Sequence, residues 1–363
     1  MRRLARDEGS IAIIAAICMV ALLGIMTIVV DVGMLYAERR QLQNGADAGA
    51  LAVALDCAKG NCAGTGSALG TARTEANANA NDGASAVSTV CGTANGLSAC
   101  NPAAPQAAWD CPQLPAAYVG AKYVLVRTQT LSNGSGVIPP FFARVISPGY
   151  TGTTVKACAR ASYGAPSSAS TIAVTESLCE WNAATNNGTT YAPAPPYPPN
   201  PSSSVERIIY LHTTSKAGSC PAGPSGSDLP GGFGFLNDPT GTCQVVVSTT
   251  GTYGDKTGAA VSQACKAAIS ADQAAKSIVY LPIYNSVTGN GTNGVYTLRG
   301  FAAFVITGYS LPGFSASSWL TGKTPCKGSD KCISGFYTQG LIPGGGTIGS
   351  GPSLGATIVQ LTG

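Results

Sequence analysis

The stretch VVDVGMLYAERRQLQNGADAGALAVAL, residues 29–55, decides the fold of the first part of the chain, because an apolar segment runs into it without a break. No charged residue occurs from Ser10 to Val30, and no proline occurs between residues 10 and 57. At about 1.5 Å per residue, the uncharged segment spans roughly 30 Å as a helix, which is the thickness of a bilayer core. We predict a transmembrane helix that continues outside the membrane for about the same length as its membrane-spanning part.

The continuation outside the membrane repeats small or apolar residues at spacings of three and four, from Val32 to Val53. This periodicity predicts that one face is packed. Gly45 and Gly49 form a GxxxG pattern, which lets two helix backbones approach closely. Because each glycine costs about 1 kcal/mol relative to alanine in a solvated helix, we expect a packing partner. Two partners remain open: a helix of another subunit, or the chain's own globular domain, on which the extension would lie as an amphipathic stalk.

Charged residues around the apolar segment predict its orientation. Three arginines precede it within residues 1–9, whereas the nearest ones that follow, Arg39 and Arg40, stand behind Asp31 and Glu38. The positive-inside rule then places the N-terminus in the cytoplasm and the C-terminal region outside it. The run is longer than that of a signal peptide and lacks a small-x-small cleavage site after it, so we expect a retained, single-pass anchor in the cell membrane. Asp31 would lie near the outer interface.

The segment from Gly9 to Leu55 resembles the N-terminal module of Tad-like (TadE/TadG) Flp pilus-assembly proteins. That module has a membrane helix, then Asp-x-Gly, then a basic residue and Leu-Gln-Asn-Ala-Ala-Asp-Ala-Ala-Ala-Leu-Ala. Asp31 and Gly33 match the first element, and Gly45 and Gly49 replace two of the family's alanines. The matches to the second element are Arg40, Leu42, Gln43, Asn44, Ala46, Asp47, Ala48, Ala50, Leu51 and Ala52.

A looser similarity lies near the C-terminus. The stretches YLPIYNSVTGNGTNGVYTLRGFAAFVITGY, residues 280–309, and PCKGSDKCISGFY, residues 325–337, are similar to the C-terminal part of TadG-like proteins from high-GC Gram-positive bacteria. Residues 1–9 also resemble a short basic prepilin leader, with a cut after Gly9. Prepilins usually carry Glu five residues after the cut, where this chain has Ile14, so we expect no processing.

The resemblance implies a non-enzymatic, membrane-anchored, pseudopilin-like component of a Tad/Flp (type IV-like) pilus-assembly or secretion system. Its N-terminal helix would pack against other pilin-like subunits. The candidate residues for that contact are Asp31, Gly33, Arg40, Gln43, Asn44, Asp47, Ala48, Gly49 and Ala50. The alternative is a stand-alone membrane-anchored surface adhesin or carbohydrate-binding protein, with a surface or glycan ligand. An exported hydrolase is a third hypothesis, for which the sequence offers no motif.

Cysteine usage supports an exported C-terminal region. Cys18 lies in the apolar run, and the twelve others form an even set in the part expected outside, where oxidising conditions let disulfides persist. We expect structural disulfides, with the short-range pairs Cys57–Cys62 and Cys326–Cys332 as local predictions. The twelve candidates are Cys57, Cys62, Cys91, Cys100, Cys111, Cys158, Cys179, Cys220, Cys243, Cys265, Cys326 and Cys332. The sequence has no CxxC pair and a single histidine, so a zinc site is not expected.

The pattern beyond the helix predicts an α+β fold with a β-rich extracytoplasmic region. We expect a basic leader at 1–9, the helix at 10–57, Cys-containing Ala/Gly/Asn-rich loops with some helix at 58–118, a β-rich segment at 119–190, a Pro-rich linker at 191–204 and a β-rich α+β module at 205–363. Helices are expected at 67–80 and 259–276. Strands are expected in YVLVRTQTL at 123, FFARVI at 141, VKACARASY at 155, TIAVTESLCEW at 171, ERIIYLHT at 206, CQVVVST at 243, SIVYLPIYNSV at 277, VYTLRGFAAFVITGY at 295 and ISGFYTQGLI at 333.

The search for chemistry leads to no catalytic residue, metal site or cofactor. GNGTNG at 289–294 matches GxGxxG, but β-prone residues follow it where a dinucleotide site needs a helix, so we interpret it as a hairpin loop. His212 has no GxSxG or spaced partner. No DxSxS occurs, and the pairs Glu176 with Glu180 and Asp228 with Asp238 carry no specific signal.

Charge and aromatic content limit the partners. Only 10% of residues are charged and the net charge is +4, with basic residues scattered singly after Arg40, so nucleic acid is not an expected partner. Aromatic residues near the C-terminus are expected in the core, with a sugar-binding face as the alternative. They are Tyr280, Tyr284, Tyr296, Phe301, Phe304, Tyr309, Phe336 and Tyr337.

Overall fold

The computed structural model describes residues 8–62, 64–100, 111, 114–118, 120–211, 220, 233–254, 261–288, 294–343 and 346–363. The chain forms two compact units. Unit 1 consists of Met1–Pro115, Lys122–Ser162 and Gln360–Gly363, and unit 2 of Ala116–Ala121 and Tyr163–Val359. The predicted α+β class is confirmed, with a long N-terminal helix followed by a β-rich, disulfide-bridged region.

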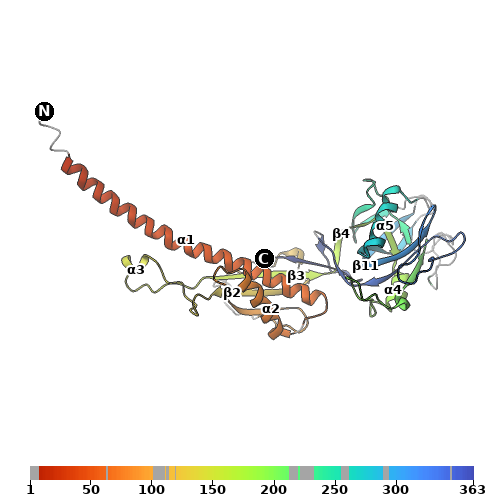
Figure 1. The fold of residues 1–363 in the computed structure, drawn as a ribbon, viewed down its shortest axis with the longest axis horizontal. Helices are drawn as coiled ribbons and strands as arrows, with labels where there is room; N and C mark the ends of the chain where they lie inside the picture. Colours follow the sequence, from red (N-terminus) through yellow and green to blue (C-terminus); the bar gives the residue numbers. More distant parts are fainter. Residues whose placement is uncertain are drawn as a thin grey trace, which may run out of the picture. The chain divides into compact units, whose positions relative to one another are not determined.

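Unit 1 is built on a single helix, α1 (Glu8–Ala58), so the predicted continuous helix is confirmed. A second helix, α2 (Gly64–Ala78), lies against the C-terminal half of α1 (Figure 1). It confirms the helix expected at 67–80. Small residues form the contact: Ala46 and Ala50 of α1 are buried, as are the three alanines of α2 at positions 68, 72 and 76. The outer part of α1 therefore lies on the chain's own domain, as the stalk alternative predicts.

Three strands of unit 1 face these helices. β1 (Ser85–Gly92) pairs antiparallel with β2 (Lys122–Thr130), and β3 (Lys156–Gly164) follows. The strands expected at 123 and 155 are thus confirmed. The last residues of the chain return to β3, where the Thr362 amide donates to the Arg160 carbonyl at 2.8 Å.

Two predictions for unit 1 are wrong. Residues 85–92 were expected to be loop but form β1, whose small side chains let α2 pack closely against it. Residues 141–146 were expected to be a strand, but the short helix α3 (Ala143–Ile146) forms there. Aromatic and β-branched composition favoured a strand, whereas hydrogen bonds from the backbone to Asp31 stabilise the helical turn instead.

The larger sheet of unit 2 has eight strands, with the central order β6-β13-β11-β10-β5-β7 and with β9 and β12 paired to β11. β10 and β11 form an antiparallel pair, while β5 runs parallel to β10. The expected strands at 171, 206, 277, 295 and 333 contribute to it. The bounds are β5 (Val174–Ser177), β6 (Arg207–Tyr210), β7 (Phe233–Phe235), β9 (Thr252–Gly254), β10 (Ile278–Thr288), β11 (Val295–Leu311), β12 (Phe314–Ala316) and β13 (Cys332–Thr338).

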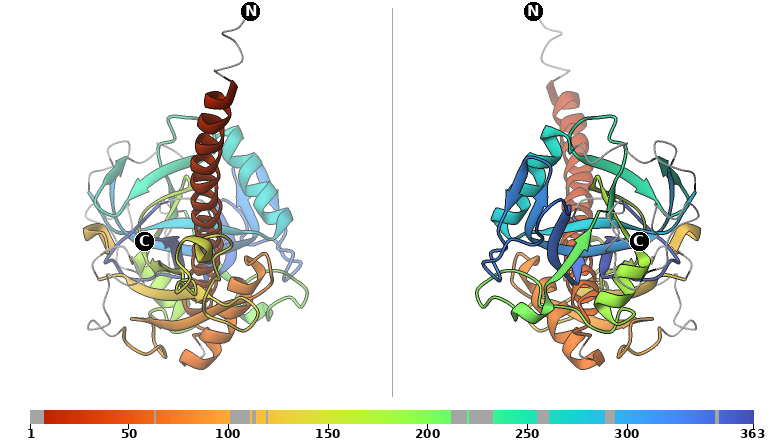
Figure 2. Two further views of the ribbon diagram at one scale, coloured as in Figure 1. Left: turned by 90° about the vertical axis from the view of Figure 1, so that its left-hand side faces the viewer. Right: turned by 90° about the vertical axis from the view of Figure 1, so that its right-hand side faces the viewer.

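Smaller elements complete unit 2. β4 lies between β15 and β8 in a three-stranded sheet, and β14 pairs in parallel with β16. The strand expected at 171 therefore splits into β4, β5 and the helix α4, which begins after the N-cap Ser177. α5 packs against β11 (Figure 2) and confirms the helix expected at 259–276. The bounds are β4 (Pro166–Ile172), α4 (Leu178–Thr185), β8 (Gln244–Ser248), α5 (Gln263–Ala275), β14 (Gly340–Leu341), β15 (Thr347–Ile348) and β16 (Ala356–Leu361), with 3₁₀ turns at Ala116–Tyr118 and Ser203–Val205.

The aromatic residues expected in the core of unit 2 are there. Seven of the eight are buried, including Phe301, Phe304 and Phe336, and Tyr280 is half-buried. They therefore form no exposed sugar-binding face. The Pro-rich stretch 191–204 lies within unit 2, where the Tyr197 ring packs 5.8 Å from that of Trp319. The six-part division of the chain stays a prediction.

All twelve cysteines of the even set pair. Both local predictions, Cys57–Cys62 and Cys326–Cys332, are confirmed. The other pairs are Cys91–Cys100, Cys111–Cys158, Cys179–Cys220 and Cys243–Cys265. Cys18 is in no disulfide.

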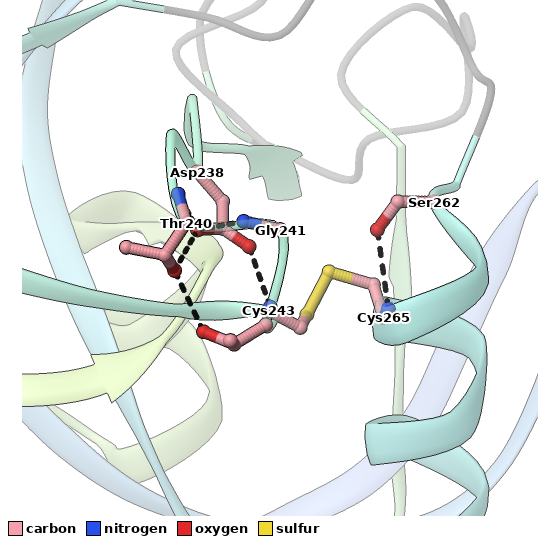
Figure 3. The surroundings of a disulfide bond; sticks show 7 residues. Asp238, Thr240, Gly241, Cys243, Ser262 and Cys265 are labelled. Carbon is pink, nitrogen blue, oxygen red and sulfur yellow. Dashed lines mark hydrogen bonds between the residues drawn. A yellow bond between two sulfur atoms is a disulfide. The ribbon is translucent and has the colours of Figure 1, made fainter.

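Figure 3 shows how the Cys243–Cys265 disulfide is held. Asp238 accepts hydrogen bonds from the Thr240 hydroxyl at 2.7 Å and from the Cys243 amide at 2.5 Å. The Cys265 amide donates to the Ser262 hydroxyl, which caps α5. Burial opposes ionisation, but these hydrogen bonds lower the pKa of Asp238. The Asp238 carboxylate therefore has a structural role.

Candidate functional site

The N-terminal part of α1 exposes an unbroken set of apolar side chains. Between Ile11 and Val29 the large hydrophobic residues are exposed, and Val20 is 71% accessible. The helix is long and apolar enough to span a membrane. In water such a surface would be unfavourable, whereas in a bilayer it faces the lipid tails.

Asp31 ends this apolar surface, and it is buried by a loop from elsewhere in unit 1. Its carboxylate accepts hydrogen bonds from three successive backbone amides: Phe141 at 2.8 Å, Phe142 at 3.1 Å and Ala143 at 2.6 Å. Figure 1 shows the resulting position of α3 beside α1. Charge-assisted hydrogen bonds of this kind are the stronger class, so Asp31 fixes where this loop meets the helix.

Gly45 and Gly49 bring α1 and α2 close together. A Cβ atom on Gly45 would lie 3.0 Å from the Cα of Ala76, and one on Gly49 would lie 3.3 Å from the Cα of Ala72. Both contacts are with backbone, which moves less easily than a side chain end. The GxxxG pattern therefore serves packing within the chain, between α1 and α2.

Gln43 and Asp47 connect α1 to the sheet of unit 1. The Gln43 amide donates to Asp47 at 2.9 Å and to the carbonyl of Cys158 in β3 at 3.0 Å. Burial raises the pKa of Asp47, and the hydrogen bond from Gln43 acts in the opposite direction. In addition, Thr128 of β2 donates to the Leu42 carbonyl. Polar positions that match the family pattern thus hold the helix on its own domain.

Most of the remaining contact candidates lie on the side of α1 that its own domain leaves open. Gly33, Arg40 and Asn44 are exposed, Ala48 is half-buried, and Ala50 is buried. The structure therefore separates the nine candidates into two sets. Asp31, Gln43, Asp47, Gly49 and Ala50 make contacts within unit 1, whereas Gly33, Arg40, Asn44 and part of Ala48 remain accessible.

A groove of about 360 Å³ lies between α1 and the chain that leads into the start of β3. Val32, Tyr36 and Arg39 line it from the helix, and Thr154 and Lys156 line it from the other side. Two basic side chains in its wall favour acidic groups.

Sequence reasoning missed the loop at 139–150, which bears the amides that Asp31 binds. The signal was available in PPFFARVISPGY, because prolines at both ends disfavour the interior of a strand. An aspartate at the end of an apolar helix also needs hydrogen-bond donors. Nothing in the sequence alone joins these two observations, which lie 110 residues apart.

The other chemical candidates are not brought together as a reactive site. Glu176 is fully buried, and burial together with the nearby charge of Glu180 raises its pKa well above the usual range. His212, Asp228 and most of GNGTNG lie outside the described residues. Among the residues that the structure describes, no group of three or more His, Cys, Asp or Glu side chains could hold a metal ion.

Comparison with known families gives a match where the helix lies. Residues 9–56 match the family model described as "Putative Flp pilus-assembly TadE/G-like". The N-terminal module of this chain is thus similar to TadE/G-like domains. The Tad-like match covers α1 almost from end to end and leaves the following 307 residues, 57–363, unmatched. No curated protein and no solved structure matches the chain. The Tad-like domain supports a role in pilus assembly, with membrane-associated pilus components as partners.

Proposed function

We propose that the protein is a non-enzymatic, single-pass membrane component of Tad/Flp pilus assembly whose α1 packs against helices of other pilin-like subunits. The observation that carries the proposal is the Tad-like match over α1 together with the open face of that helix at Gly33, Arg40 and Asn44. The opposite face is occupied by α2 and β2. A partner helix would therefore meet the open face.

The proposed topology has the N-terminus in the cytoplasm and both folded units outside. The arginines of residues 1–9 support this orientation through the positive-inside rule. The six disulfides give independent support, because such bonds persist in oxidising compartments. The domain would then present its sheet region outside the cell while α1 holds it at the membrane.

The structure also supplies a matched pair of variants to test the interface. Arg40 on the open face of α1 and Arg73 on α2 are both exposed helical arginines. Arg40→Glu should abolish or strongly reduce surface pili in a strain whose only copy carries it, because charge reversal at a helix contact opposes docking. Arg73→Glu should leave piliation normal. Pili are counted by electron microscopy, beside the deletion strain and the complemented strain, with immunoblots to show equal protein levels.

The outcomes separate two functions. Normal piliation in the Arg40→Glu strain would exclude this helix face as the contact. Normal piliation in the deletion strain would exclude an assembly role and favour the second candidate, a surface adhesin.

The adhesin hypothesis has its own observation, a groove of about 670 Å³ in unit 2. Hydroxyl and amide side chains line it, including Ser170, Thr240 and Gln244, beside the Tyr253 ring. Polar groups next to an aromatic ring suit a sugar. An array of glycans probed with the full chain, in comparison with a Gln244→Ala variant, would test this use of the groove.

A further inference from the structure

The loop at 139–150 projects apolar side chains away from unit 1. Phe141 is 73% and Val145 is 82% exposed, although neither residue type is usual at such exposure. Phe142 beside them is 38% exposed. Phe141 and Val145 are large apolar residues whose side chains are mostly exposed, which indicates that this surface contacts something other than water.

The position of this loop along α1 indicates what covers it. Asp31 binds the amides of Phe141, Phe142 and Ala143, so the loop is fixed at the point where the uncharged segment of α1 ends. If residues 11–30 fill the hydrocarbon core, at about 1.5 Å per residue, the loop lies at the boundary of that core. Exposed apolar side chains of α1, including Val29 and Val30, lie within two residues of Asp31, so the exposed surface of the loop and the apolar segment of the helix end at the same level.

The chemistry of the loop suits this boundary. Backbone amides near lipid must be satisfied within the protein, and Asp31 accepts from three of them. Segments that lie in the membrane interface carry Trp, Phe and Leu on their apolar face, which fits Phe141 and Phe142. Arg144, exposed between Phe141 and Val145 in sequence, has the length and charge to reach lipid phosphates.

The geometry points to a second membrane contact: the loop at 139–150 inserts Phe141 and Val145 into the outer interface of the bilayer that α1 spans. The inserted loop and the helix then hold unit 1 at two points, which limits its rotation about α1. The occupant of this surface is the lipid bilayer. The inference rests on the membrane-spanning role of α1, which the experiment below tests separately.

The test uses site-specific photocrosslinking of the full chain in phosphatidylcholine–phosphatidylglycerol vesicles whose acyl chains carry an alkyne. Benzoylphenylalanine replaces Phe141 or Val145 in separate variants. Val20 within the apolar segment is the positive control, and exposed Lys59, beyond the far end of α1, is the negative control. After irradiation, lipid adducts are made fluorescent through the alkyne and measured on a gel.

We expect lipid adducts at positions 141 and 145 that are comparable to those at 20 and about tenfold above those at 59, because lipid tails are confined to the bilayer core. Asp31→Ala should reduce the lipid adduct at position 141 several-fold, because the hydrogen bonds that hold the loop to α1 are lost. The lipid adduct at position 20 should be unchanged by Asp31→Ala, because the helix remains inserted. Retention of the disulfides, checked by thiol labelling, shows that the variant is folded.

Three results would overturn the inference. Lipid adducts at 20 but none at 141 and 145 would show that the loop stands clear of the membrane, and a protein adduct there would identify a second subunit as the occupant. Loss of lipid adducts at 20 as well would remove the anchor itself, and the inference with it. Neither of the first two results bears on the proposed role in pilus assembly, which the piliation counts test independently.

Discussion

At the scale of single residues, Glu176 makes the stability of unit 2 depend on pH. Its side chain is fully buried in β5, one oxygen accepts from the Ser177 amide at 3.0 Å, and the other has no hydrogen-bond partner among the residues that the structure describes. Burial first, and then the charge of Glu180, raises its pKa well above the usual 4.5. As pH rises above 4.5 the unfolded chain loses this proton while the folded chain keeps it, so the free energy of unfolding falls.

Glu176→Gln should remove this dependence, because glutamine does not ionise. Below pH 4.5 the variant and the natural protein should be similar in stability, and at neutral pH the variant should be the more stable. Urea unfolding followed by fluorescence of Trp181 and Trp319, both in unit 2, measures the difference at several pH values. Glu75→Gln in unit 1 is the control. Parallel pH profiles for natural protein and Glu176→Gln would show that Glu176 is not the group responsible.

Asp31 shows how far residue-level prediction reached. Its place at the outer end of the apolar segment could be predicted, because a charge is tolerated at the interface and not within the core of a bilayer. The hydrogen-bond partners of Asp31 could not be predicted, because the three amides come from a loop more than a hundred residues away. The same holds for Gln43, whose helix position was clear but whose bond to the Cys158 carbonyl depends on the tertiary fold.

At the scale of elements, the α1–α2 contact should depend on glycine at position 45. A leucine there would press on the Ala76 backbone, whose Cα lies 3.0 Å from the position of a Cβ. We expect Gly45→Leu to lower the free energy of unfolding of unit 1 by about 1–3 kcal/mol, as overpacking does. Gly70→Leu in α2 is the matched control, because no atom lies within 4 Å of its Cβ position. That change should raise stability by up to about 1 kcal/mol through helix propensity.

Amide hydrogen exchange of α1 and α2 measures both changes, since the protected amides report local opening. Equal effects of the two leucines would mean that α1 and α2 are not in close contact at position 45. The sequence predicted both helices and the need for a partner, but it left open which partner. Helical periodicity describes a face, and it does not say whether that face meets another subunit or the same chain.

The two wrong elements have a common cause. β1, with the sequence SAVSTVCG, has little of the bulk typical of a strand, yet small residues are what a strand needs beneath a closely packed helix. FFARVI has that bulk but is helical in part, because Asp31 stabilises the turn. In both places a tertiary contact outweighs local propensity, which spans only about 1 kcal/mol per residue.

At the scale of the whole molecule, the covalent framework was only partly accessible to sequence. The pairs that close short loops, Cys57–Cys62 and Cys326–Cys332, could be predicted from proximity. Cys111–Cys158 and Cys179–Cys220 join residues 47 and 41 positions apart, and only the folded chain brings them together. Twelve cysteines allow too many pairings for spacing to decide.

The long-range disulfide of unit 1 should contribute more to stability than the short one. Under the chain-entropy model, closing the 47-residue separation of Cys111–Cys158 is worth about 4 kcal/mol and the 5-residue separation of Cys57–Cys62 about 2 kcal/mol. Cys158 also lies in β3, where its carbonyl accepts from Gln43 of α1, so this bond holds the strand that anchors the helix.

Replacing Cys111 and Cys158 together by alanine should therefore increase amide exchange throughout β2 and β3 by a larger factor than replacing Cys57 and Cys62 together. The two double variants are compared in the same detergent-solubilised full chain, each with its remaining five disulfides verified by mass after thiol labelling. If the 57/62 variant exchanges as fast as the 111/158 variant, loop length is not what sets the contribution. In the oxidising location proposed for this region, failure to form Cys111–Cys158 would loosen the sheet on which α1 is held, so piliation should fall with it even though the open face of α1 is unchanged.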